Sequence, residues 1–145
     1  RHEAGLAARE LQRAFKDAQK MVDKINSEVK KAEKELAKKS EIPEDVSHLL
    51  KDVKKKLKKL TKAFSSGWDG PEFEVMDLAG QLQASTSRPT EAQLRLLEQL
   101  TQKVTTNIGK LNTFIQQDYA NFRNKLKDIG VGEIRIKPVQ PPRKN

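Results

Sequence analysis

The chain has 145 residues, a length that fits one domain, and its hydrophobic fraction of 35% nearly equals its charged fraction of 34%. It contains no cysteine, which excludes disulfides, thiolate catalysis and zinc sites of the finger type. There are 29 Lys and Arg residues against 20 Asp and Glu residues, so a formal net charge of +9 draws anions toward the surface.

No stretch of the sequence approaches the roughly 18 to 20 apolar residues that a membrane-spanning helix needs, so we expect no transmembrane segment. The chain begins at Arg1, with neither an initiator methionine nor a charged-then-apolar signal segment. We therefore expect it to be an excised or processed piece of a longer protein.

The first predicted helix covers residues 3–39 and carries an apolar seam whose steps alternate between four and three residues. Such a seam lies on one stripe of a helix, which must then pack against other helices. Glutamates and lysines fill many of the other positions, where we expect ion pairs within the helix. The seam consists of Leu11, Phe15, Ala18, Val22, Ile25, Val29, Ala32 and Leu36.

A break at residues 40–43 precedes the second predicted helix. Pro43 is tolerated in a first helical turn, and the acidic Glu44 and Asp45 suit the positive end of a helix dipole. Because the break is short, the first two helices should be antiparallel neighbours. The seam of the second helix consists of Val46, Leu49, Leu50, Val53, Leu57, Leu60 and Phe64.

Residues 65–71 form the clearest predicted loop, since two glycines and a proline interrupt any helical pattern. We expect Trp68 within it to cover the end of the bundle rather than to bind a ligand. A shorter helix follows, weakened at Gly80 unless close packing needs the space there. Its apolar side consists of Phe73, Val75, Met76, Leu78, Ala79 and Leu82.

The last predicted helix begins at a capping box formed by Thr90 and Gln93 and ends at Gly130, a natural helix stop. Residues 133–145 follow this helix. They begin with Ile134 and Ile136 in alternation with charged residues and continue with prolines and basic residues, which predicts a tail. The seam of this helix consists of Leu94, Leu97, Leu100, Val104, Ile108, Leu111, Phe114, Ile115, Phe122, Leu126 and Ile129.

Together these elements predict an all-α fold, an up-down-up-down bundle of about four helices of which two are long. Residues 1–132 form the bundle domain and residues 133–145 a basic, proline-containing tail. If the long helices project beyond the shorter pair, their free ends would form a coiled-coil extension. Seam residues such as Leu11, Phe15 and Ile129 would then be available to a partner.

Residues that could carry catalysis or bind a metal are scarce. The two histidines, His2 and His48, lack metal-ligand spacing. The sequence has no glycine-rich phosphate loop, no nucleophile elbow and no Glu-x-x-His motif. We therefore expect no enzyme, no cofactor, no metal site and no small-molecule substrate.

The most prominent charged feature is a run of lysines in the second helix, which includes Lys56 and is interrupted by one acid, Asp52. Nucleic-acid sites usually add arginines or stacking aromatics, and neither is interleaved here. A solvated helix face is the favoured interpretation, and nucleic acid is not the expected partner. The residues that would contact a polyanion or a partner protein are Lys51, Lys54, Lys55, Lys58, Lys59 and Lys62.

Residues 66–134 carry a series of features that belong together: Gly70-Pro71, a short helix ending near Leu82, the run Arg88-Pro89-Thr90-Glu91-Ala92-Gln93 before a long helix with Leu111-Asn112, and the segment from Leu126 to Gly130. In these features the chain resembles the helical C-terminal region of bacterial sortilin-like proteins. Proteins of that family are large, carry neuraminidase-type repeats and are often labelled glycosyl hydrolases.

The resemblance implies that this chain is the helical domain following a large β-propeller, and that any sugar or peptide site belongs to the propeller. It also implies an extracytoplasmic location. We therefore expect a non-catalytic accessory interaction or assembly domain, whose partner is the parent propeller or a second copy. The alternative is a stand-alone basic bundle that binds nucleic acid or an anionic surface without specificity.

Overall fold

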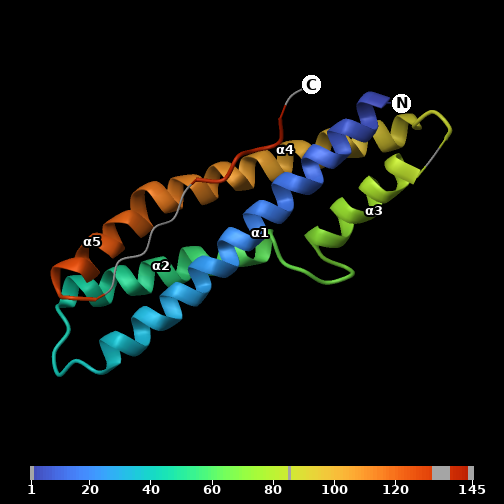
Figure 1. Ribbon diagram of the computed structural model, residues 1–145. Helices are drawn as coiled ribbons and strands as arrows, with labels where there is room; N and C mark the ends of the chain where they lie inside the picture. The colour runs from blue at the N-terminus through green and yellow to red at the C-terminus, as the bar shows by residue number, and fades with distance from the viewer. Residues whose placement is uncertain (1, 85, 132–137, 144–145) are drawn as a thin grey trace.

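The computed structural model describes all residues except 1, 85, 132–137 and 144–145 (Figure 1). Its elements are α1 (His2–Ala37), α2 (Glu44–Ala63), α3 (Pro71–Ala84), α4 (Glu91–Phe114), the π-helical segment η1 (Ile115–Tyr119) and α5 (Ala120–Asp128). The described residues contain no strand, so the predicted all-α bundle with two long helices is confirmed.

The second long helix is a continuous rod made of α4, η1 and α5 (Figure 1). Its π-helical turn was not predicted, because the buried Ile115 and Tyr119 are four positions apart, a spacing that an α-helix also accommodates. Phe114 and Tyr119 are five positions apart, and in an α-helix residues so spaced lie about 140° from each other around the axis. The wider turn instead lets the rings of Phe114 and Tyr119 stack, with centroids 5.8 Å apart.

The two shorter helices lie one after the other, and both run antiparallel to the two long helices (Figure 1). Lys54 of α2 pairs with Glu33 toward the end of α1, whereas Glu72 of α3 pairs with Lys16 nearer its start. A cross-section of the bundle therefore cuts the two long helices and either α2 or α3. The predicted alternation of directions holds except between α2 and α3, because the loop joining them carries the chain forward along the bundle.

The seam of α1 is buried along its whole length, with every predicted seam residue exposed by 3% or less. Toward the N-terminus, Ala4, Ala8 and Ala14 widen the buried face with small side chains. α3 lies close to this part of α1, since a Cβ added at Gly5 would lie 4.0 Å from the carbonyl oxygen of Leu82. The first half of α1 thus packs on α3 and the second half on α2.

The expectation that seam residues at the ends of the long helices stay available to a partner is wrong for Leu11 and Phe15. Each is only 1% exposed, and the rings of Phe15 and Phe64 lie 5.4 Å apart between centroids. Phe15 is thus covered by the C-cap residue of α2, and Leu11 lies in the half of α1 on which α3 packs. Ile129 is half-buried.

Both predicted ends of the second long helix are confirmed. The hydroxyl of Thr90 accepts a hydrogen bond from the Gln93 backbone at 3.0 Å, and the Gln93 side chain accepts one from the Thr90 backbone at the same distance. At the other end Gly130 has a φ of +81°, and the Val131 amide donates to the Leu126 carbonyl at 2.9 Å. This pattern is the glycine-terminated stop that satisfies the last carbonyls of a helix.

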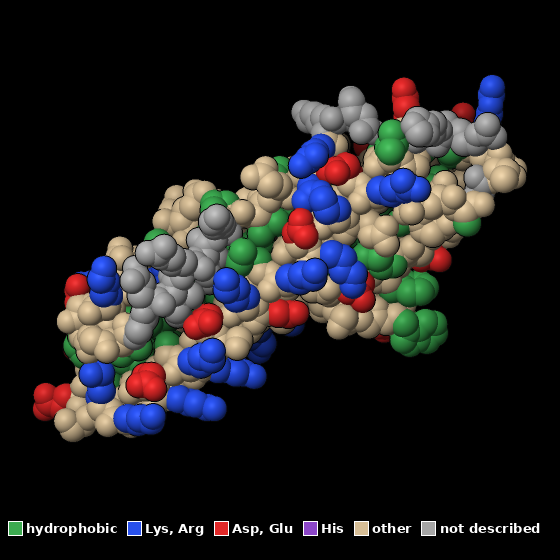
Figure 2. Space-filling model, in the orientation of Figure 1, with side chains coloured by type: hydrophobic (Ala, Val, Ile, Leu, Met, Phe, Trp, Pro, Cys, Tyr) green, Lys and Arg blue, Asp and Glu red, His purple; other side chains and the backbone are tan. Residues whose placement is uncertain are grey.

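Trp68 does not cover an end of the bundle, contrary to expectation, because the α2–α3 loop lies midway along the molecule. It is 80% exposed and meets the edge of the half-exposed Phe73 ring at a centroid distance of 6.2 Å. Figure 2 shows hydrophobic side chains protruding beside this loop. Leu94, predicted in the seam of the last helix, is also exposed, at 45%.

The predicted tail is only partly described, since Ile134 and Ile136 lie outside the described residues. Residues 138–143 have no helix, as expected, but they do not extend freely into solvent. Val139 is only 6% exposed and belongs to the hydrophobic core. The described part of the tail therefore packs against the bundle.

Replacing Ile25 with Asp should destabilise the fold by at least about 3 kcal/mol, because the new carboxylate would lie unpaired in a fully buried position. Ser27→Asp adds the same charge at an exposed position of the same helix and should change the free energy of unfolding by less than about 0.5 kcal/mol. Thermal melts followed by circular dichroism compare the two variants. Equal melting temperatures would contradict the assigned core.

Two glycines should respond in opposite directions to replacement by alanine. A Cβ added at the exposed Gly80 meets no atom within 4 Å, so Gly80→Ala should stabilise the protein by about 0.5 to 1 kcal/mol. Gly130→Ala should destabilise it by about 1 to 2 kcal/mol, because the φ of +81° disfavours a side chain. Denaturant titrations measure both; a destabilising Gly80→Ala would mean that close packing needs the glycine.

Candidate interaction site

The structure divides the lysines predicted as contact residues among three surroundings. Nζ of Lys54 lies 2.9 Å from Oε2 of Glu33 on α1, and Lys59 lines a groove between α2 and α4. The remaining four are exposed, follow one another at steps of four, three and four, and have no ion-pair partner in the described part of the chain. This outer lysine stripe consists of Lys51, Lys55, Lys58 and Lys62.

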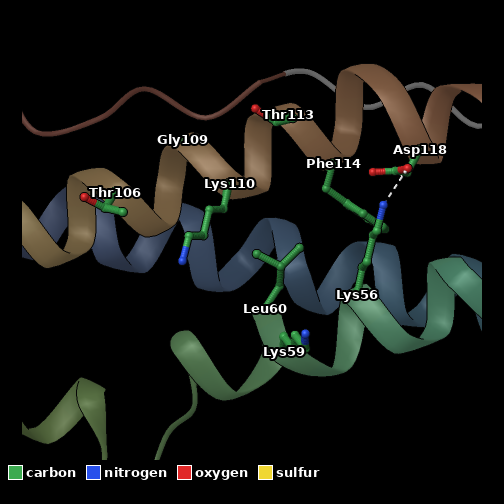
Figure 3. Close-up of a pocket in the computed structure, with 9 residues that line it drawn as sticks. All are labelled: Lys56, Lys59, Leu60, Thr106, Gly109, Lys110, Thr113, Phe114 and Asp118. Atoms are coloured by element: carbon green, nitrogen blue, oxygen red, sulfur yellow. Dashed lines mark hydrogen bonds and ion pairs between the residues drawn. The ribbon is translucent and has the colours of Figure 1, made fainter.

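The groove lies between α2 and the second long helix and has a volume of about 530 Å³ (Figure 3). Leu60 and Phe114 point into it from opposite sides and form a mainly apolar floor. The described residues that line the groove are Lys56, Lys59, Leu60, Thr106, Gly109, Lys110, Thr113, Phe114 and Asp118.

Small residues of α4 keep the groove open. Thr106, Gly109 and Thr113 follow one another at steps of three and four, which places them on one side of the helix. A Cβ added at Gly109 would meet no atom within 4 Å. Larger side chains at these positions would fill the space between α2 and α4.

The rim of the groove is positively charged. Nζ of Lys56 lies 2.9 Å from Oδ1 of Asp118, a pair that joins α2 to η1 at one end of the groove (Figure 3). Lys59 and Lys110 are exposed and have no carboxylate partner within ion-pair distance among the described residues. The groove therefore offers an apolar floor together with two ammonium groups that an incoming carboxylate could pair with.

Tyr119 at the end of η1 is fully buried, and its hydroxyl has no hydrogen-bond partner among the residues described. The guanidinium carbon of Arg123 lies 5.8 Å from the centre of the Tyr119 ring. Burial, and then the negative charge of Glu28, raises the pKa of the Tyr119 phenol to about 12. A phenol with this pKa is poorly matched to acid–base catalysis near neutral pH.

Other titratable groups do not assemble into a reactive cluster in the described part of the chain. No group of three or more His, Asp or Glu side chains there is placed to hold a metal ion. His48 is exposed, and its Nε2 lies 3.6 Å from Oε1 of Glu44 on the same helix. Within the same residues, no helix has the length and apolar character needed to cross a membrane.

Sequence reasoning identified one groove residue, Lys59, among its candidates and missed the others. Thr106, Gly109 and Thr113 carry a recognisable pattern, since small residues recur at helical spacing beside the predicted seam. That pattern predicts a shallow helix face but not what lies opposite it. Lys110 and Asp118 become groove residues only because α2 packs alongside.

Comparison of the chain with protein-family models, with curated proteins and with solved structures found no match in any of the three. The features that bear on function are therefore those of the molecule itself. They are the apolar groove, its two lysines that have no carboxylate partner among the described residues, and the outer lysine stripe.

Replacing Tyr119 with Phe should leave the protein at least as stable at pH 7, because it removes a buried hydroxyl that has no hydrogen-bond partner in the described part of the chain. The phenol pKa is about 12 in the folded chain and near 10.0 ordinarily, so the unfolded chain releases this proton first. The raised pKa therefore stabilises the native protein fully below pH 10. About 1 kcal/mol of this stabilisation should be lost from the free energy of unfolding by pH 11.

Denaturant titrations at pH 7 and pH 11 test this pH dependence. Lysines also titrate in this range, so the comparison is between the native protein and Tyr119→Phe at each pH. The loss of stability should be smaller in the variant. Identical losses in the two proteins would rule out a buried, neutral Tyr119.

Proposed function

We propose that this chain is a non-catalytic interaction domain whose α2–α4 groove docks an acidic amphipathic helix of a partner protein. The observation that carries the proposal is the combination of an apolar floor, Leu60 and Phe114, with the exposed lysines Lys59 and Lys110 at its rim. Apolar anchors of a docked helix would fill the groove, and its carboxylates would pair with the two ammonium groups.

The dimensions of the groove favour a helix as the occupant. From Thr106 to Asp118 the lining of the second long helix covers about 18 Å at 1.5 Å per residue, roughly three helical turns. Three helices meet in each cross-section of the bundle, so a helix in this groove would take a fourth position. Its apolar residues at i, i+4 and i+7 would lie over Leu60, Gly109 and Phe114.

The resemblance to sortilin-like proteins supports a wider proposal, in which the domain assembles onto the β-propeller of a larger exported protein. The short helix and the Thr90 capping box, which carry part of that resemblance, have the expected helical geometry. Sequencing the complete gene tests this proposal. We expect several hundred residues with repeated strand patterns before Arg1, and their absence would contradict this proposal.

The outer lysine stripe favours a second candidate, contact with a polyanion. Its four lysines have no ion-pair partner in the described residues and follow one line along the outer face of α2. Such contacts release counterions, so binding should fall steeply between low and physiological salt and should not depend on nucleic-acid sequence. This candidate uses a different face of α2 from the groove, and charge reversals therefore separate the two.

Filling the groove should weaken docking strongly without unfolding the protein. Gly109→Leu places a helix-forming side chain in open space, and Gly80→Leu is the matched control on an exposed face of α3. The probe is a fluorescent synthetic peptide of about 18 residues with Leu on one helical face and Glu on the other. Fluorescence anisotropy should show binding to the native chain and to Gly80→Leu, but at least tenfold weaker binding to Gly109→Leu.

Charge reversal distinguishes the groove from the outer lysine stripe. The double variant Lys59→Glu/Lys110→Glu should weaken peptide binding, whereas Lys51→Glu/Lys62→Glu, with the same change of net charge, should not. A scrambled peptide of the same composition should not bind. Equal effects of the two double variants would refute docking in the groove, and a larger effect of Lys51→Glu/Lys62→Glu would favour contact through the outer lysine stripe.

A further inference from the structure

The described part of the tail, residues 138–143, lies along α1 and α4 (Figure 1). The side-chain amide of Asn112 on α4 holds both backbone groups of Val139. Its Nδ2 donates to the Val139 carbonyl at 2.8 Å, and its Oδ1 accepts from the Val139 amide at 2.7 Å. One side chain thus pairs with the backbone of an extended segment much as a neighbouring strand would.

Residues of α1 hold the next part of the tail. Arg13 donates from Nη2 to the Pro141 carbonyl at 3.0 Å, and Oε2 of Glu10 accepts from the Arg143 amide at 3.1 Å. Arg13 is itself fixed by Asp17, whose Oδ2 lies 2.8 Å from Nη1. The tail seat, defined as Asn112, Glu10 and Arg13, therefore belongs to two helices that are already packed together.

The tail is well suited to such a seat. Three prolines, Pro138, Pro141 and Pro142, restrict the chain to extended conformations and lack an amide that would need a partner. Val139 is the anchor, 6% exposed, between neighbours that remain open to solvent. The loss of conformational entropy on binding is therefore small for a segment of this composition.

We infer that the tail seat is a binding site for extended, proline-flanked basic peptides, occupied here by the chain's own C-terminal segment. Recognition uses backbone hydrogen bonds, one small apolar side chain and a basic residue near Glu10. The tail, being covalently attached, competes at a high effective concentration with any peptide supplied from outside. This inference is independent of the proposed function, since the seat lies between α1 and α4.

The charge environment of Glu10 agrees with this arrangement. The hydrogen bond from the Arg143 amide, followed by that from Arg13, lowers the pKa of the Glu10 carboxyl below its usual value. The carboxylate therefore contributes to tail seating above its ordinary pKa of 4.5, and this contribution is lost as the pH falls through the lowered folded pKa. Seating should be weakest in acid.

The test frees the seat in the full-length chain and offers the tail in trans. Val139→Glu places a charge where the anchor is buried and should displace the chain's own tail without altering the helices. The probe is a fluorescein-labelled peptide of residues 136–145, followed by fluorescence anisotropy. We expect at least tenfold tighter binding to Val139→Glu than to the native chain, whose seat is filled.

A second substitution identifies the seat. Adding Asn112→Ala to Val139→Glu should weaken peptide binding again by about tenfold, the scale of two lost hydrogen bonds. Adding Asn107→Ala, an amide elsewhere on α4, is the matched control and should have no effect. Hydrogen exchange of the Val139 amide in otherwise native chains gives a second readout, slow in the native protein and fast in Asn112→Ala.

Absence of peptide binding to a folded Val139→Glu chain would overturn the inference, as would equal binding to the variants with and without Asn112→Ala. Fast exchange of the Val139 amide in the native chain would also overturn it, because the seat would then not hold its own tail. These outcomes leave the groove proposal untouched, because the peptide and the variants involve the other face of α4.

Discussion

Burial of the α1 seam is the constraint on which the rest of the structure depends. With 36 residues α1 is about 54 Å long, whereas α2 and α3 have 20 and 14 residues, so neither can cover it alone. The two shorter helices therefore succeed one another along α1, and the second long helix completes the core. The loop between α2 and α3 consequently lies midway along the molecule, which leaves Trp68 on an open side rather than over an end.

The same arrangement explains the surface of α2. Its apolar stripe faces the core, so its lysines must occupy all the remaining directions. Lys54 and Lys56 pair with Glu33 of α1 and Asp118 of η1, and exposed pairs of this kind contribute about 0.2 to 1 kcal/mol each. Lys59 instead lines the groove and has no carboxylate partner among the described residues.

α4 contacts different neighbours through different parts of its circumference. Its apolar seam packs in the core, its small residues around Gly109 line the groove, and Asn112 binds the tail. One rigid helix thereby connects an open site with an occupied one. The wider turn of η1 forms one end of the groove through Asp118, and it sets the ring stacking of Phe114, a floor residue of the groove, on Tyr119.

The sequence by itself determined the helices and their ends, because these depend on residues only a few positions apart. The α1 seam, the Thr90 capping box and the Gly130 stop are all properties of this kind. Of the candidate site it provided Lys59 but not Gly109, whose importance depends on the helix opposite. Tertiary structure alone decided the exposure of Trp68, the groove and the docking of Val139. Each of these depends on the direction in which the chain leaves one helix and on what then lies across from it, which local spacing does not encode.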